Sequence, residues 1–394
     1  MYITILGRQP LLGLAELERV YGKASRFSRQ AAMLNAEPDI IRLGGSLKAG
    51  RVVTTLPRGE WRDAHAAILK HYFNTWKTSE QKITLGISVY DLQASSRDIQ
   101  RTGIELKKRL KAEHTSLRLL PNATPALNTA TSHHNKLGLS PNKVELLVIK
   151  GDDGTIIIAE STGAQNITSL AARDQGRPKR DAFVGMLPPK LAQIIINLAV
   201  GPRIHEPDGH MPELLDPFCG TGVILQEALL MGYTVHGSDL SEKMIDYTLQ
   251  NISWLQEKYR HHGTTATVRT GDATTYQWRE ASILDAVACE TYLGQPFSAP
   301  PSPSKLREVR GNCNHIIGSF LRNIGTQLSS GTTLCLAVPA WRGKDGAFTH
   351  LPLVRELESY GFMHIPLAST HRDPLLYYRE DQVVARELLV IAKT

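Results

Sequence analysis

Short apolar segments alternate with amphipathic ones through the second half of the chain, from residue 213 onward. The apolar segments have the length of strands, and the others have the three- and four-residue spacing of helices. The predicted strands cover 213–218, 234–240, 266–272, 284–290, 332–340, 362–369 and 382–392, and the predicted helices cover 222–231, 241–256, 305–328 and about 350–360. This alternation predicts a doubly wound α/β sheet that binds ligands at the carboxyl ends of its strands. The last two strands have no helix between them, so we expect an antiparallel hairpin at one edge.

The first 165 residues mix strands and helices without a regular βαβ repeat. Strands are predicted at 1–7, 82–90, 116–120, 143–150 and 154–161, and helices at 10–22, 61–76 and 96–114. The segment 40–57 is predicted to form a strand, a glycine turn and a second strand. This order indicates one or two small α+β units rather than a parallel sheet. A polar, proline-containing stretch at 173–181 follows, and the apolar segment 188–200 then begins with two prolines, which suit the first turn of a helix. We expect that helix to cap the sheet of the second half.

The amino-acid composition indicates a globular protein and argues against several other classes. The 394 residues are 42% apolar, which is typical of globular domains with real cores, and two or three domains are expected. We expect no membrane span and no signal peptide, since the chain has no apolar run of 18 residues and its first residues carry no leader pattern. The four cysteines are far apart and form no CxxC motif. We therefore expect reduced thiols in a cytoplasmic protein, without a zinc site.

Positive charge is concentrated in the first half. Residues 1–200 contain 28 Lys and Arg against 17 Asp and Glu, whereas residues 201–394 contain 17 against 21. A basic first half favours a polyanionic partner, although solvated surface lysines are the ordinary alternative. The candidate phosphate contacts lie on the helix at 96–114, in the polar loop at 122–143 and in the stretch at 173–181: Arg101, Lys107, Lys108, Lys111, Lys136, Arg173, Arg177, Lys179 and Arg180. A solvated helix face and a plain linker are the competing interpretations. His133 and His134 lack companion ligands for a metal site.

The stretch "DPFCGTG" at 216–222 joins a predicted strand to a predicted helix. It lacks the lysine of a phosphate-binding P-loop, and Leu225 stands where a dinucleotide fingerprint needs its third glycine. Asp216, at the strand end, also places negative charge where either ligand would bring phosphate. That charge suits a ligand that carries a cation instead. S-adenosylmethionine has an ammonium group, a sulfonium group and no phosphate.

Two further acids follow at the ends of the next strands. Asp239 lies 23 residues after Asp216, where a carboxylate can accept both ribose hydroxyls, and Asp272 could accept the adenine amino group. Gly220 and Gly222 permit positive φ and a close approach of the backbone to a ligand. The methionine carboxylate would then rest on the helix amino terminus after Gly222. Each aspartate alone could be an ordinary helix cap, but three at successive strand ends favour S-adenosylmethionine.

These motifs resemble those of the THUMP-domain RNA methyltransferases, most closely the enzymes that methylate the exocyclic N2 of guanosine 10 in tRNA. The segments "DPFCGTGVILQEA", "GSDLSEKMI" and "GDAT" are similar to the cofactor motifs, and "GMLPPKLAQIIINLA" is similar to the helix that opens the catalytic domain. "LGRQPLLGLAELE" and "RLGGSLK" resemble the small ferredoxin-like domain of that family, and "ATSHHNKLGL" falls where the THUMP loop would lie. The likeness covers nearly the whole chain.

The resemblance implies a domain plan and a set of binding residues. It divides the chain into a ferredoxin-like domain at 1–60, a THUMP-like RNA-binding domain at 61–165, a linker at 166–185 and a Rossmann-like class I methyltransferase domain at 186–394. It implies an enzyme that uses S-adenosylmethionine and binds tRNA or another structured RNA. We expect a cytoplasmic protein with no metal, and no obligate protein partner is evident from the sequence. The implied cofactor-binding residues are Asp216, Cys219, Gly220, Gly222, Asp239, Leu240, Asp272 and Ala273.

One departure from the family concerns the catalytic motif. At the end of the fourth strand, amino-methylating relatives usually carry D/N-P-P-Y/F, in which the acid and a backbone carbonyl hold the amine and the ring stacks on the base. Here Glu290 takes the acid position, Thr291 and Tyr292 replace the prolines, and Leu293 takes the aromatic position. We predict that Glu290 accepts an N–H and the proton, and that Tyr292 stacks on the base from a position shifted by one residue. A helix-start acid and a packed aromatic ring are the structural alternatives.

The altered motif leaves three functions open. The first is methylation of a guanine amine in tRNA, the second is methylation of an amine in rRNA or DNA, and the third is a non-catalytic tRNA-binding factor. A proline-rich run at 295–306 follows the motif and either shapes base entry or serves as a spacer. Trp341, Arg342 and Arg372, near later strand ends, are possible substrate contacts.

Overall fold

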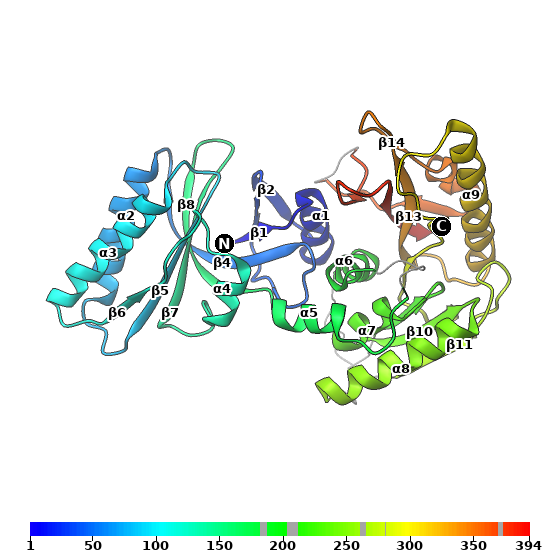
Figure 1. Cartoon of the computed structure of the whole chain (residues 1–394), viewed down its shortest axis with the longest axis horizontal. Coiled ribbons are helices and arrows are strands. Elements are labelled where there is room, and N and C mark those ends of the chain that lie inside the picture. The colour runs from blue at the N-terminus through cyan, green and yellow to red at the C-terminus, as the bar shows by residue number, and fades with distance from the viewer. Residues whose placement is uncertain (182–186, 203–211, 261–264, 280, 369–372) are drawn as a thin grey trace. The chain divides into compact units, whose positions relative to one another are not determined.

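The computed structural model describes residues 1–181, 187–202, 212–260, 265–279, 281–368 and 373–394. The chain forms two compact units, Met1–Leu170 and Ala171–Thr394, which we call unit 1 and unit 2 (Figure 1). Arg372 and part of the predicted linker at 166–185 lie outside the described residues. No helix within the described ranges is long and apolar enough to cross a membrane.

Unit 1 is built on one eight-stranded mixed sheet, in the order β2-β3-β1-β4-β8-β7-β5-β6. Its strands are β1 (Tyr2–Leu6), β2 (Ala24–Ser28), β3 (Ala31–Leu34), β4 (Ser46–Leu56), β5 (Ile83–Tyr90), β6 (Leu117–Leu119), β7 (Lys143–Lys150) and β8 (Ile156–Ala164). Its helices are α1 (Pro10–Tyr21), α2 (Trp61–Trp76), α3 (Ser96–Ala112) and α4 (Thr129–His134), and α5 (Ile167–Gln175) crosses into unit 2. Helices α2 and α3 lie side by side and cover one face of the sheet (Figure 1).

The sheet of unit 1 runs through the predicted domain boundary at residue 60. Strand β4 pairs with β1 on one side and with β8 on the other, so the ranges 1–60 and 61–165 share one set of backbone hydrogen bonds. The division into ferredoxin-like and THUMP-like domains therefore stays a prediction. The β2–β3 hairpin escaped the sequence analysis because β2 is an edge strand whose Ser25 and Arg26 are exposed, which removes the usual alternation.

A buried ion pair links three strands of unit 1. Lys48 on β4 and Glu145 on β7 are 1% and 0% exposed, and their side chains are hydrogen-bonded to each other. Lys48 Nζ also donates to the Leu127 carbonyl at 2.7 Å, and Ser88 Oγ on β5 donates to Glu145 at 2.6 Å. Burial lowers the pKa of Lys48, against the opposing effect of Glu145. The pair is fully enclosed, so losing one member leaves an uncompensated charge.

Replacing Lys48 with methionine is expected to destabilise unit 1 by about 3–5 kcal/mol, because Glu145 would remain buried without its cation. Urea denaturation followed by circular dichroism measures this loss. The control is the double variant Lys48→Met/Glu145→Leu, which removes both charges and should recover most of the stability. Equal destabilisation in the single and double variants would show that packing, rather than the unpaired carboxylate, controls stability here.

Unit 2 contains the predicted doubly wound sheet, in the order β11-β10-β9-β12-β13-β17-β15. Its strands are β9 (Glu213–Asp216), β10 (Thr234–Asp239), β11 (Ala266–Thr270), β12 (Ala286–Glu290), β13 (Thr333–Arg342), β14 (Phe348–Thr349), β15 (Phe362–His364), β16 (Leu376–Tyr377) and β17 (Val384–Lys393). Its helices are α6 (Pro189–Val200), α7 (Val223–Leu230), α8 (Glu242–Tyr259) and α9 (Pro303–Gly325), with short 3₁₀ turns at Ala281–Ile283, Pro352–Arg355 and Leu357–Tyr360.

The strand directions in unit 2 fix where ligands can approach. Strands β9 to β13 are parallel, whereas β17 is antiparallel to both β13 and β15. This confirms the predicted antiparallel edge pair. The strand order reverses direction between β9 and β12, and such a switch point is where open α/β sheets bind ligands. The predicted helix at 350–360 is instead two separate 3₁₀ turns, because the backbone leaves helical geometry at Glu356 (φ −122°).

Candidate active site

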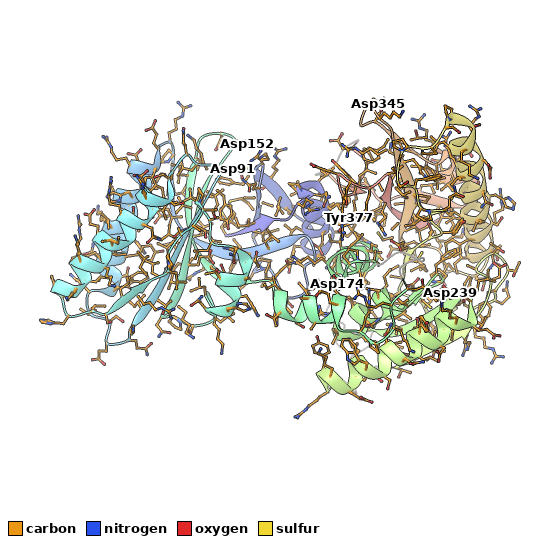
Figure 2. All side chains as sticks on the ribbon, viewed as in Figure 1. Asp91, Asp152, Asp174, Asp239, Asp345 and Tyr377 are labelled. Atoms are coloured by element: carbon orange, nitrogen blue, oxygen red, sulfur yellow. The ribbon has the colours of Figure 1, made fainter. Side chains whose placement is uncertain are left out.

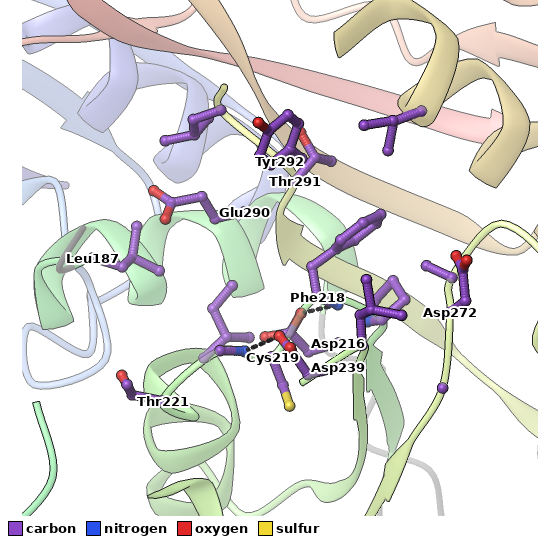
Figure 3. A pocket seen from close by; sticks show the side chains of 18 of the residues that line it. Leu187, Asp216, Phe218, Cys219, Thr221, Asp239, Asp272, Glu290, Thr291 and Tyr292 are labelled. Atoms are coloured by element: carbon purple, nitrogen blue, oxygen red, sulfur yellow. Dashed lines mark hydrogen bonds between the residues drawn. The ribbon is translucent and has the colours of Figure 1, made fainter. Parts of the chain in front are cut away.

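A cavity of about 490 Å³ lies at the carboxyl ends of β9, β10 and β12, on both sides of the switch point (Figure 3). It is lined by all but one of the predicted cofactor and catalytic residues: Asp216, Cys219, Gly220, Asp239, Leu240, Asp272, Ala273, Glu290 and Tyr292. Gly222 is not in the wall. The residues that sequence analysis did not single out are mostly apolar or small, and include Leu187, Phe218, Thr221, Ile224, Thr274 and Ile316.

Asp216 ends β9 and is 2% exposed. Its Oδ1 accepts the N–H of Phe218 at 3.1 Å, which turns the chain away from the sheet directly after the strand. The ring of Phe218 packs edge-on against Phe320 of α9, with 5.1 Å between centroids. Burial raises the pKa of Asp216 well above its usual range, and the nearby charges of Asp239 and Glu290 raise it further. A cation in the cavity would offset this electrostatic cost.

The glycine loop after Asp216 is held by the carboxylate of Asp239, at the end of β10. Asp239 Oδ2 accepts the N–H of Gly220 at 2.9 Å, and its Oδ1 accepts the N–H of Ser241 at 2.9 Å. Gly220 and Gly222 have φ values of 52° and 78°, which glycine adopts without strain. A side chain at Gly222 would also come within 2.8 Å of Thr248 on α8. Gly222 therefore shapes the loop from outside the cavity wall.

Asp272 stands two residues after β11, on the opposite side of the cavity. Its Oδ1 accepts both the N–H and the hydroxyl of Thr274, at 2.9 and 2.7 Å. Oδ2 accepts no hydrogen bond from the described residues. Asp239 and Asp272 thus both bond to the backbone two residues ahead, and each still lines the cavity. The amino-terminal cap of α8 is Ser241 rather than Asp239.

The cavity wall carries four carboxyl groups, and no lysine, arginine or histidine lines it among the described residues. This distribution is unfavourable for phosphate and favourable for a cationic ligand. Cys219 is not a nucleophile candidate, because burial raises the pKa of its thiol well above the usual range. The described ranges contain no cluster of three or more histidine, cysteine, aspartate or glutamate side chains able to hold a metal ion.

Glu290, at the end of β12, forms an ion pair that the sequence did not reveal. The Arg386 Nε on β17 donates a hydrogen bond to Glu290 Oε1, and both side chains are largely buried. The two residues are 96 positions apart in sequence, and β13 lies between their strands in the sheet. Glu290 Oε2 accepts no hydrogen bond from the described part of the chain. The arrangement fixes the carboxylate and leaves one oxygen for a substrate.

Thr291 and Tyr292 follow Glu290 and have different environments. Thr291 is buried, and both its N–H and its hydroxyl donate to the carbonyl of Ala337 on β13, each at 3.0 Å. These two bonds fix the turn where related motifs carry a proline. Tyr292 is 41% exposed at the cavity, so its ring is available to a planar ligand rather than packed in the core.

The basic residues predicted in unit 1 lie on its surface. Arg101, Lys107, Lys108 and Lys111 are exposed on α3, and Lys136 is exposed just after α4. The apolar residues of α3, such as Leu106 and Leu110, are buried against the sheet. The helix therefore turns a positively charged face to solvent, which allows phosphate contacts without requiring them.

Two of the predicted linker cations do not reach the surface. Arg173 is 7% exposed and holds Glu227 of α7 with two hydrogen bonds, at 2.5 and 2.9 Å. Arg177 is 3% exposed, and burial lowers its pKa. Burial removes both from the predicted phosphate contacts, and Arg173 instead ties α5 to α7. Only Lys179 and Arg180 remain accessible there, and Asn251 of α8 fixes the backbone of Lys179.

Comparison with known proteins shows partial sequence relatives. No protein-family model matches the chain. It is 32% identical over 189 residues to a tRNA (guanine(10)-N2)-dimethyltransferase of Methanothermobacter thermautotrophicus, covering 46% of this chain and 48% of that protein. Proteins of the same name match from Pyrococcus abyssi (38% identity; 30% of this chain and 32% of the relative) and Methanocaldococcus jannaschii (26% identity; 61% and 66%). The chain thus spans about half the length of the first relative and less than two thirds of the others.

The fold is similar to a solved structure over its full length. The crystal structure of TrmN from Thermus thermophilus aligns with 100% of this chain and 99% of its own, with a TM-score of 0.53 and 17% sequence identity. Together with the strand order of unit 2, this likeness confirms the predicted Rossmann-like, class I methyltransferase fold.

Proposed function

We propose that the protein is an S-adenosylmethionine-dependent tRNA (guanine-N2)-methyltransferase, acting on the guanosine at position 10 that the family resemblance implies. The observation that carries the proposal is a single cavity in which carboxylates from three successive strands face an acid and an exposed tyrosine from a fourth. The names of the partial sequence relatives agree with this activity. A cytoplasmic location, and action without a metal or an obligate protein partner, belong to the same proposal.

The residues of the cavity fit S-adenosylmethionine by charge and hydrogen-bonding capacity. The buried Asp216 would face the cationic part of the cofactor, Asp239 would accept ribose hydroxyls, and Asp272 Oδ2 would accept the adenine amino group. The amino terminus of α7, which follows Gly222, would receive the methionine carboxylate. When bound, S-adenosylmethionine supplies an activated methyl group on a good leaving group. Phosphate-bearing cofactors fit poorly, since four carboxyl groups would surround them.

Glu290, Thr291 and Tyr292 would hold the guanine. Glu290 Oε2 would accept one N–H of the exocyclic amine, and the Thr291 carbonyl is a second acceptor one residue on. Arg386 keeps the Glu290 carboxylate in one orientation, because a charge-assisted hydrogen bond is stronger and more directional than a neutral one. Tyr292 would stack on the base, which must leave its own stack to enter the cavity. Rate enhancement would come mainly from positioning the amine.

The exposed cations of unit 1 would hold the tRNA backbone. Arg101, Lys107, Lys108 and Lys111 on α3, with Lys136, would neutralise phosphates and make binding fall steeply with salt. Lys179 and Arg180 would add contacts in unit 2. A THUMP-like role for residues 61–165 and a ferredoxin-like role for residues 1–60 are part of this proposal.

The test is nucleoside mass spectrometry of tRNA incubated with the protein and S-adenosylmethionine. The substrate is total tRNA from cells that lack this chain, and rRNA and duplex DNA are tested in parallel. The proposal predicts that the native protein produces N2-methylated guanosine in tRNA. The Glu290→Gln variant should produce little of it. Methylation found only in rRNA or only in DNA would make that nucleic acid, rather than tRNA, the substrate. tRNA binding without any methyl transfer would indicate a non-catalytic binding factor.

A further inference from the structure

Unit 2 contains a second cavity, of about 480 Å³, at the carboxyl end of β13. One wall is the proline-rich segment that leads into α9, and the other is the end of β13 with the turn that follows it. The lining residues are Pro300, Pro301, Ser302, Pro303, Leu306, Trp341, Arg342, Gly343, Lys344 and Thr349. The cavity thus joins two sequence features that the proposed function does not use, the run at 295–306 and Arg342.

The charge of this second cavity is opposite to that of the first. Arg342 and Lys344 line it, and no aspartate or glutamate of the described residues does. The nearest acid in sequence, Asp345, lies in the turn between β13 and β14 (Figure 2), and its Oδ1 accepts the backbone N–H of Ala347 at 3.0 Å. Helix α9 begins at Pro303, so its positive end also lies at the cavity. The three features together favour an anion.

Arg342 is held ready for such a ligand. Its Nη1 donates to the carbonyl of Glu380 at 3.2 Å, and its guanidinium lies 5.5 Å from the ring centre of Tyr378. These contacts fix the planar group, and its other N–H groups donate no hydrogen bond to the described residues. Lys344 is exposed. Its flexible four-carbon side chain allows the ammonium group to reach a bound anion. The prolines opposite provide a rigid apolar wall for a sugar or base.

The two cavities are arranged along one edge of the sheet. Glu290 on β12 is in register with Ala337 on the parallel strand β13, and Arg342 lies five residues further along β13, about 17 Å at the rise of a strand. The chain segment from Thr291 to Pro303 starts in the wall of the first cavity and ends in the wall of the second. A strand of nucleic acid that delivers a base to Glu290 can therefore pass the second cavity.

We propose that the second cavity binds a phosphodiester group, with its attached nucleoside, next to the target guanosine in the RNA. The inference rests on the proposed function, since it requires an RNA substrate. The division of charge gives the site its selectivity: the carboxylates of the first cavity repel phosphate and admit the base, while Arg342 and Lys344 hold the backbone beside it. Binding there would supply the energy that keeps the base out of its stack.

The test compares Arg342→Ala/Lys344→Ala with a control that removes the same charge elsewhere in unit 2, Lys258→Ala/Arg322→Ala. Both control side chains are exposed and line neither cavity. We expect the cavity variant to raise KM for tRNA by about 10-fold and to reduce the slope of log affinity against log salt by about 1 to 2, with S-adenosylmethionine affinity unchanged. The control should reduce the slope less and leave KM near that of the native protein.

Three outcomes would overturn the inference while leaving the proposed function intact. The first is that the native enzyme methylates tRNA, but the cavity variant and the control have equal KM values. The second is that millimolar GMP displaces bound tRNA equally well from the native protein and from the cavity variant, which would place mononucleotide binding elsewhere. The third is tight GMP binding that disappears in the cavity variant while tRNA affinity is unaltered, which would identify a free-nucleotide site instead. Absence of tRNA methylation in the native protein would count against the proposed function itself.

Discussion

Replacing Arg386 with methionine is expected to lower kcat for methyl transfer by about 100-fold, with little change in affinity for S-adenosylmethionine. Arg386 contacts Glu290 and does not line the cofactor cavity. Without it, the Glu290 carboxylate is free to move by about 1 Å, and a misplacement of that size can cost on the order of 100-fold in rate. Single-turnover kinetics with labelled cofactor and tRNA, beside calorimetry with the cofactor alone, separate the two effects.

The neighbouring residue on β17 supplies a matched control. Glu387 is also buried, but its side chain lies on the other face of the sheet and contacts His350 at 2.7 Å. Glu387→Gln removes a buried charge from the same strand without touching Glu290, and kcat should stay within about threefold of native at equal folded fraction. Arg386→Lys, which keeps the charge but not the fixed N–H geometry, should recover only part of the rate. Similar losses in all three variants would mean that β17 acts only through stability.

Replacing Asp216 with asparagine is expected to weaken S-adenosylmethionine binding by about 30- to 100-fold and, at the same time, to stabilise the ligand-free protein. The affinity falls because a buried carboxylate that faces a cation contributes about 2–3 kcal/mol to the interaction. The stability rises because Asp216 is buried near Asp239 and Glu290, with no compensating cation among the residues that the structure describes, and asparagine has no charge to bury. Calorimetry and thermal unfolding measure the two changes. A fall in the stability of the ligand-free protein, together with the fall in affinity, would contradict the conclusion that Asp216 is a destabilising buried charge.

The raised pKa of Asp216 also predicts a direction for the effect of pH. In the ligand-free protein, the ionised form of Asp216 is disfavoured, so the free energy of unfolding should fall as pH rises from the usual carboxyl range through the raised pKa. A cationic ligand favours the ionised form, so affinity for S-adenosylmethionine should rise over the same pH range, with release of a proton. Calorimetry in buffers of different ionisation enthalpy detects that proton. Asp216→Asn should abolish its release, and a release that persists would assign it to another group.

The sequence predicted those parts of the site that depend on the positions of residues along the chain. Asp216 and Asp239 end two consecutive strands of a parallel sheet, and Asp272 follows the next strand by two residues. The carboxyl ends of such strands meet at one edge, so the spacing of the three acids alone predicted a shared cavity. Position along the chain likewise placed Glu290 and Tyr292 beside it. The pairing of Glu290 with Arg386 could not be found in this way, because it depends on β17 returning antiparallel beside β13.

Burial of charged residues was the other feature that local sequence could not supply. Arg173 and Arg177 belong to a polar stretch that has the composition of an exposed linker, yet both are buried. The partner of Arg173 is Glu227, which stands more than 50 residues later on α7. The ion pair of Lys48 could not be predicted for the same reason, since Glu145 is 97 residues away in sequence. The cations of α3 are exposed, and their contact with RNA stays a prediction, whereas Arg173 and Arg177 are too buried to contact phosphate.

The central claim is that the cavity bounded by Asp216, Asp239 and Asp272 is built for a nucleoside that bears a positive charge and no phosphate. Isothermal titration of the full chain with S-adenosylmethionine, and separately with ATP and NAD, tests it most directly. The account predicts saturable binding of one S-adenosylmethionine per chain, weakened in Asp216→Asn, and no comparable heat from either phosphate ligand. Tight binding of ATP or NAD, with no heat from S-adenosylmethionine, would contradict it.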